Sequence, residues 1–125
     1  MPRPFPDTRP NPDRVLVVAT PPHALDLLRL AVLRSDDVLF VAETVPTEAQ
    51  RFAQHFAIEV VRRPFAWGDL AGVAALLVAL DDREAENRIV REARRHGVPV
   101  HVVDRPLVSD FSMLGMLERP SLIAA

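Results

Sequence analysis

The chain has 125 residues, of which 49% are hydrophobic and 26% charged, and its formal net charge is −2. This length and composition indicate one globular domain, and the charge gives no electrostatic case for nucleic acid or an anionic membrane as a partner. The absence of cysteine excludes disulfides, thiolate nucleophiles and cysteine-ligated metal centres. No apolar run reaches the length of a membrane span, and the first residues lack the apolar core of a secretory signal, so we expect a cytoplasmic protein.

Residues 1–13 carry five of the twelve prolines. Proline has no amide donor and a fixed φ, so this segment is predicted to be a flexible, extended arm. The remaining residues, 14–125, are predicted to form a single domain.

Short aliphatic runs alternate with helical patterns along this domain. The runs at 14–19, 38–42, 58–61, 74–80 and 98–103 have the length and β-branched content of buried strands. Helices are expected over 23–34, over 44–55 and from Asp81 to Gly97. The alternation predicts an α/β fold, a Rossmann-like and mainly parallel five-stranded sheet with helices on both faces. Ligands of such sheets bind at the carboxyl ends of the strands.

The segments 111–118 and 121–125 look like a short C-terminal strand pair. Their apolar residues run to the last position of the sequence, and a buried strand rarely ends with nothing after it. We therefore expect either that this edge relies on a partner, a second copy in a homodimer or a separately encoded protein, or that a downstream part has been lost.

The turn after the first strand reads Ala19, Thr20, Pro21, Pro22. Dinucleotide binding at this point usually requires glycines, so that backbone amides can approach the pyrophosphate at a helix N-terminus. The turn has no glycine, and each proline removes an amide, so the residues alone argue against the usual geometry. The helix dipole and the hydroxyl of Thr20 remain. Thr20 could also cap the next helix, with Pro21 at its first position.

Three carboxylates follow predicted strands at the same edge. Glu43 ends the second strand, 24 residues after Ala19, where a carboxylate can accept a ribose hydroxyl; a solvated strand end is the alternative. Asp81 and Asp82 follow the fourth strand. Asp81 is expected to cap the helix, with Glu84 completing a capping-box pair, and any role toward a cofactor would be additional.

Asp104 ends the fifth strand, directly before Arg105 and Pro106, and caps no obvious helix. A partly desolvated carboxylate at this position could act as a general base, and a salt bridge to an arginine is the alternative. No two of the four histidines have the i, i+4 spacing of helical metal ligands, so we expect no protein-held metal site.

Several short motifs occur in a fixed order over 14–125. Together they resemble the N-terminal dehydrogenase module of siroheme synthase, a family of precorrin-2 dehydrogenases that are often also sirohydrochlorin ferrochelatases. The residues that carry the resemblance are Arg63-Pro64-Phe65, Asp69-Leu70-Ala71-Gly72, Ala79-Leu80-Asp81-Asp82, Ala93-Arg94 with Gly97, Val102-Val103-Asp104-Arg105-Pro106, and Phe111.

The resemblance implies NAD-dependent oxidation of precorrin-2 to sirohydrochlorin in siroheme biosynthesis, with iron insertion as a further step. It implies a tetrapyrrole substrate and places the family's catalytic aspartate on Asp104. The family's glycine turn falls on Ala19, Thr20 and Pro21, which join Glu43, Asp81 and Asp82 as candidate NAD-binding residues.

Two alternatives follow from the altered turn. One is a degenerate, non-catalytic Rossmann-like module that binds a tetrapyrrole, a nucleotide or a partner protein. The other is a chelatase without the redox step, which would need Asp104 but not the glycines.

Overall fold

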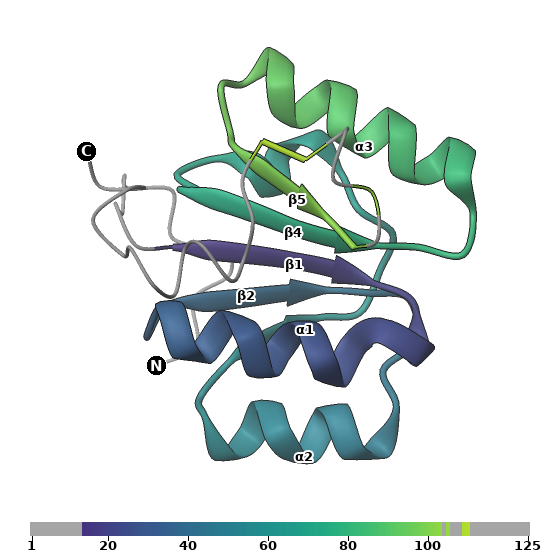
Figure 1. Ribbon diagram of the computed structural model, residues 1–125. Coiled ribbons are helices and arrows are strands. Elements are labelled where there is room, and N and C mark those ends of the chain that lie inside the picture. Colours follow the sequence, from purple (N-terminus) through teal and green to yellow (C-terminus); the bar gives the residue numbers. More distant parts are fainter. Residues whose placement is uncertain (1–13, 104, 106–108, 111–125) are drawn as a thin grey trace.

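The computed structural model of the protein describes residues 14–103, 105, 109 and 110 (Figure 1). The predicted arm at 1–13, the predicted C-terminal strand pair and Asp104 lie outside these described residues.

Five parallel strands form one sheet, in the order β3-β2-β1-β4-β5. They are β1 (Val15–Ala19), β2 (Val38–Val41), β3 (Glu59–Val61), β4 (Ala75–Ala79) and β5 (Val100–Val102). The chain builds outward from β1 to β2 and β3, then crosses back to add β4 on the other side of β1. The strand order therefore reverses between β1 and β4, and this switch point is where open α/β sheets bind ligands.

Helices cover both faces of the sheet (Figure 1). Helix α1 (Pro21–Arg34) and helix α2 (Thr47–His55) pack on one face. Helix α3 (Arg83–Arg95) packs on the other, together with the short 3₁₀ helix η1 (Trp67–Leu70). The predicted Rossmann-like fold, with a parallel five-stranded sheet between helices, is confirmed.

Strands β1 and β4 lie side by side in the interior of the sheet, and their sequences are apolar throughout. Every residue of β1 and β4 is buried, because alternate side chains enter the two opposite cores. In β1, Val15 and Val17 face α1, whereas Leu16 and Val18 face α3. Each such side chain contributes about 1.5–3 kcal/mol of transfer free energy on burial.

Helix boundaries differ from the prediction in two places. Helix α2 begins at Thr47 rather than at 44, because a residue before proline disfavours the helical region and Pro46 itself is extended. Helix α3 begins at Arg83, and its cap is Asp82, not Asp81. The Asp82 Oδ1 accepts the backbone N–H groups of Glu84 and Ala85 at 3.0 and 3.2 Å.

The predicted end of α3 is confirmed. Gly97 has a φ of 71°, the left-handed conformation that glycine adopts at low cost directly after a helix. Within the described ranges, none of the helices is both long and apolar enough to cross a membrane.

Candidate functional site

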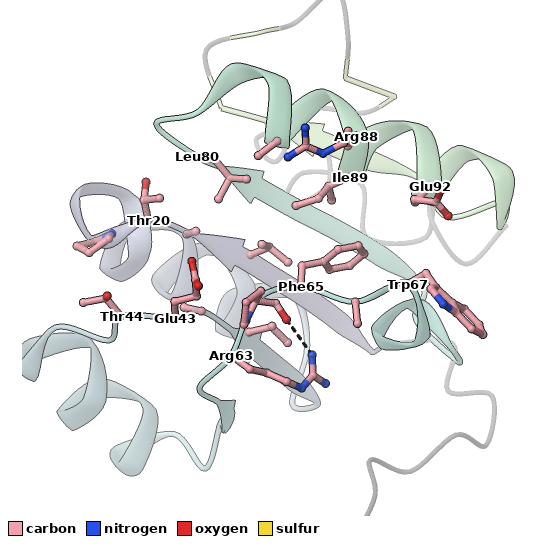
Figure 2. A pocket seen from close by; sticks show the side chains of 18 residues that line it. Thr20, Glu43, Thr44, Arg63, Phe65, Trp67, Leu80, Arg88, Ile89 and Glu92 are labelled. Carbon is pink, nitrogen blue, oxygen red and sulfur yellow. Dashed lines mark hydrogen bonds between the residues drawn. The ribbon is translucent and has the colours of Figure 1, made fainter.

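A cavity of about 610 Å³ lies at the carboxyl ends of β1, β2 and β4, on the side of the sheet that carries α3 (Figure 2). Its floor is apolar and includes Val18, Val41 and Leu80. The segment 63–67 and one face of α3 form its walls. Its volume is in the range of small-molecule sites, and it lies at the switch point where the fold predicts ligand binding.

The parallel pairing of β1 and β2 brings candidate cofactor-binding residues of the two strands together. Val18 of β1 lies opposite Val41 of β2, so the residues that follow the two strands meet at one edge although 24 positions separate Ala19 from Glu43. Four of the six cofactor-binding candidates line the cavity as a result: Ala19, Thr20, Pro21 and Glu43.

The other two candidates are placed differently. Asp81 and Asp82 are not part of the cavity lining. Asp82 caps α3, and the Asp81 Oδ1 lies 3.9 Å from the His23 Nε2 at the start of α1. The predicted general base, Asp104, lies outside the described residues.

The turn between β1 and α1 has its backbone donors already engaged. The N–H of Thr20 donates to the carbonyl oxygen of Ala79 at 3.0 Å, and the N–H of His23 donates to the Thr20 carbonyl at 3.0 Å. Pro21 and Pro22 have no N–H at all. Thr20 is the N-cap residue of α1 and Pro21 the first helical residue, as predicted. The Thr20 hydroxyl, however, donates to the same Ala79 oxygen at 3.4 Å and makes no capping hydrogen bond.

Arg63 and Asp69 hold the wall segment in place. Their side chains form a two-pronged ion pair with N–O distances of 2.9 and 2.5 Å, and Asp69 is buried. The Arg63 Nη1 also donates to the Pro64 carbonyl, the contact drawn in Figure 2, and Asp69 accepts the N–H of Ala66. The hydrogen bond from Asp69 raises the pKa of Arg63 above its usual value. The arginine and aspartate of the quoted motif therefore support the position of Phe65 in the cavity wall.

Glu86 is a buried carboxylate that is not among the candidate residues predicted from the sequence. Its Oε2 accepts the backbone N–H of Leu80 at 3.0 Å, and its Oε1 accepts the Arg105 Nη1 at 2.7 Å. It is 5% exposed. Glu86 therefore ties the junction of β4 and α3 to the residue that follows Asp104. Only the three-dimensional contact reveals this link, because the partners are 19 positions apart.

Trp67 and Arg88 add an aromatic ring and a cation to the cavity lining. Trp67 lies at the end of the cavity away from Thr20 and is 69% exposed (Figure 2). Its ring lies parallel to that of His96, with centroids 6.2 Å apart. Arg88 projects from α3, is exposed, and makes no ion pair within the part of the chain that the structure describes.

Comparisons with known proteins agree with this architecture. A family model described as "Putative NAD(P)-binding" matches residues 8–114. Siroheme synthase of Ectopseudomonas mendocina is 34% identical over 111 residues, which cover 89% of this chain and 24% of that protein. Siroheme synthase of Azotobacter vinelandii is 30% identical over 112 residues, covering 90% of this chain and 24% of that protein. The predicted resemblance to siroheme synthase is confirmed, and the chain spans about a quarter of the length of these relatives.

A solved structure shows the same fold. SirC, a precorrin-2 dehydrogenase, superposes with a TM-score of 0.52 at 24% sequence identity, over 70% of this chain and 43% of that one.

Proposed function

The chain belongs to the NAD(P)-binding family, and from this premise we propose that it acts in siroheme biosynthesis, on a tetrapyrrole bound at the carboxyl edge of its sheet. The match over residues 8–114 and the siroheme synthase relatives support the pathway. The cavity between Thr20 and Trp67 supports the place of binding.

The family implies a bound dinucleotide, whose pyrophosphate would lie at the turn after β1. A pyrophosphate at the switch point needs free backbone donors at the start of α1. Here Thr20 and His23 direct their N–H groups to other carbonyls, and the two residues between them are prolines. The turn therefore does not fit a pyrophosphate held in the usual way.

The step that we propose is insertion of a divalent metal ion into the macrocycle, which needs no redox cofactor. The observation that carries this choice is an open cavity beside a turn whose donors are engaged. As the metal ion enters, two ring N–H groups each lose a proton and the metal–nitrogen bonds form, so neither the ring nor the ion is oxidised. We propose Asp104 as the group that accepts these protons.

The described residues support this step in three ways. Phe65 and Trp67 offer apolar and aromatic surface to the macrocycle, and Arg88 offers a cation to its carboxylate side chains. The contact between Glu86 and Arg105 restrains the chain next to Asp104. Glu86 is therefore a positioning residue in this proposal.

The test uses two matched aspartate-to-asparagine variants. Asp104→Asn should abolish the protein-dependent rate of cobalt insertion into sirohydrochlorin, followed by absorbance. Asp36→Asn removes an exposed carboxylate in the turn between α1 and β2, at the opposite edge of the sheet, and should retain the wild-type rate. Equal rates for wild type and Asp104→Asn would remove Asp104 from the site.

A second candidate is the NAD-dependent oxidation of precorrin-2. Glu43 favours it, because this carboxylate lines the cavity at the end of β2, where a ribose hydroxyl can be accepted. Appearance of NADH absorbance on mixing protein, precorrin-2 and NAD⁺ would support this candidate over metal insertion.

The apolar residues at the end of the sequence bear on its assembly. We propose that the chain works with a second copy or a separately encoded protein of the siroheme pathway, in the cytoplasm, and that nucleic acid and membranes are not partners. Light scattering during gel filtration, with and without a uroporphyrinogen methyltransferase, would test the assembly.

A further inference from the structure

We propose that the proline turn after β1, rather than any other part of the crevice, prevents this chain from binding a dinucleotide. The inference concerns the cavity described above but does not depend on metal insertion. In this proposal, the features that prevent dinucleotide binding are confined to the turn residues Thr20, Pro21 and Pro22.

The backbone donors can be accounted for one position at a time. A helix normally leaves its first four N–H groups without intrahelical partners, and these groups bind anions. At α1 the four positions run from Thr20 to His23. The first donates to Ala79, the two prolines have no hydrogen to donate, and the fourth donates to Thr20. Two of the four would have to break an existing hydrogen bond to reach a phosphate oxygen, and the other two cannot donate at all.

The nearby side chains do not replace the lost donors. The hydroxyl hydrogen of Thr20 is directed to Ala79, and the His23 imidazole lies 3.9 Å from the Asp81 carboxylate. The Arg63 guanidinium is held by Asp69. Arg88 lines the same cavity but projects from α3 and not from the turn (Figure 2). A pyrophosphate at the turn would therefore meet carbonyl oxygens and proline rings.

The rest of the crevice keeps what a nucleoside needs. The cavity persists beside the turn, Glu43 stands at the end of β2 to accept ribose hydroxyls, and Phe65 and Ile89 offer apolar surface to a ring. Pro21 and Pro22 are both exposed, so their replacement does not disturb the core. Amides restored at these two positions would face a crevice that is otherwise formed.

The experiment therefore looks for a gain of binding. The double variant Pro21→Gly/Pro22→Gly restores two amides. Pro22→Ala restores one amide, introduces a good helix former and leaves Pro21 in place. Pro99→Ala is the control, since it adds an amide before β5, at the opposite edge of the sheet. Each protein is titrated with NAD⁺ by calorimetry at low and high salt, and circular dichroism confirms that each is folded.

The double variant should bind NAD⁺ at least about tenfold more tightly than the wild type, the factor expected for one charge-assisted hydrogen bond, and high salt should reduce the gain. Pro22→Ala should show a smaller gain, and Pro99→Ala none. In a nitrogen–proton correlation spectrum of Pro22→Ala, the new amide of residue 22 should shift on addition of NAD⁺.

Three results would overturn the proposal. One is micromolar NAD⁺ affinity in the wild type, because the turn would then not prevent binding. Another is a folded Pro22→Ala protein whose new amide does not respond to NAD⁺, because the loss would then extend beyond the turn. The third is an equal gain in Pro99→Ala. None of these results depends on whether the protein inserts a metal ion.

Discussion

The Arg105 Nη1 lies 2.7 Å from the Glu86 Oε1, so the residue next to Asp104 is anchored to a buried carboxylate at the start of α3. The same carboxylate accepts the N–H of Leu80, the first residue after β4. One side chain thus connects the carboxyl ends of β4 and β5, the edge at which the proposed chemistry takes place.

Replacement of Glu86 by glutamine should destabilise the fold by about 1–3 kcal/mol, because the part-buried contact between Glu86 and Arg105 loses its charge pairing. Glu84→Gln changes an exposed carboxylate in the same helical turn and should cost less than about 0.5 kcal/mol. Urea unfolding measures both. Equal midpoints for the two variants would show that the ion pair does not stabilise the protein.

If Glu86 also positions Asp104, Glu86→Gln should change the pH profile of metal insertion, and not only the amount of folded protein. An unchanged profile with reduced stability would assign Glu86 a purely structural role.

Arg63→Lys should destabilise the protein by about 2 kcal/mol, since lysine cannot make the two-pronged contact that satisfies buried Asp69. Arg62→Lys, whose guanidinium donates to the Gln50 side chain in an exposed hydrogen bond, should have little effect. Thermal unfolding distinguishes the two variants. If Arg63→Lys were as stable as Arg62→Lys, the Arg63–Asp69 ion pair would have no supporting role.

The pKa of Arg63 determines how the stabilisation by the Arg63–Asp69 ion pair depends on pH. Its hydrogen bond to Asp69 raises the folded-state pKa of Arg63, so its stabilisation is complete below the unfolded pKa and is lost only above the folded one. Both pKa values lie far above the neutral range. The difference in unfolding free energy between wild type and Arg63→Met should therefore not change through titration of Arg63 between pH 6 and pH 9, as urea titrations at both values would show.

Asp82→Ala should cost about 1 kcal/mol of unfolding free energy, because two N–H groups at the start of α3 lose their acceptor. Asp81→Ala leaves that cap intact and should cost less. The reverse order in urea unfolding would return the capping role to Asp81, as the sequence alone indicates.

Arg88→Gln should weaken tetrapyrrole binding by about tenfold and reduce its dependence on salt, because one cation facing the ligand's carboxylates is lost. Arg91→Gln, on the same helix but outside the cavity lining, is the matched control. Trp67 is the only tryptophan of the chain and lines the cavity, so quenching of its fluorescence by sirohydrochlorin reports binding directly. Equal affinities for the two variants would place the ligand elsewhere.

The local sequence pattern was sufficient to predict the strands and much of the edge at which the cavity lies. The continuous apolar residues of β1 predict a strand buried on both faces, and parallel pairing then brings Thr20 and Glu43 to one edge. The cap of α3 could not be predicted to the residue, because Asp81 and Asp82 are chemically identical and only backbone geometry selects Asp82.

Long-range contacts were not predictable from one sequence. The link between Glu86 and Arg105 joins residues 19 positions apart, and no local pattern indicates which arginine a buried carboxylate selects. The missing glycines were visible in the sequence, but the engagement of Thr20 N–H by Ala79 depends on how β1 lies against β4.

The most direct test of the proposed function is the rate of cobalt insertion into sirohydrochlorin, followed by absorbance with and without NAD⁺. The proposal predicts a rate above the protein-free reaction that is the same in both conditions. A rate no greater than the protein-free reaction, together with NADH formation from precorrin-2 and NAD⁺, would contradict it and establish the oxidation instead.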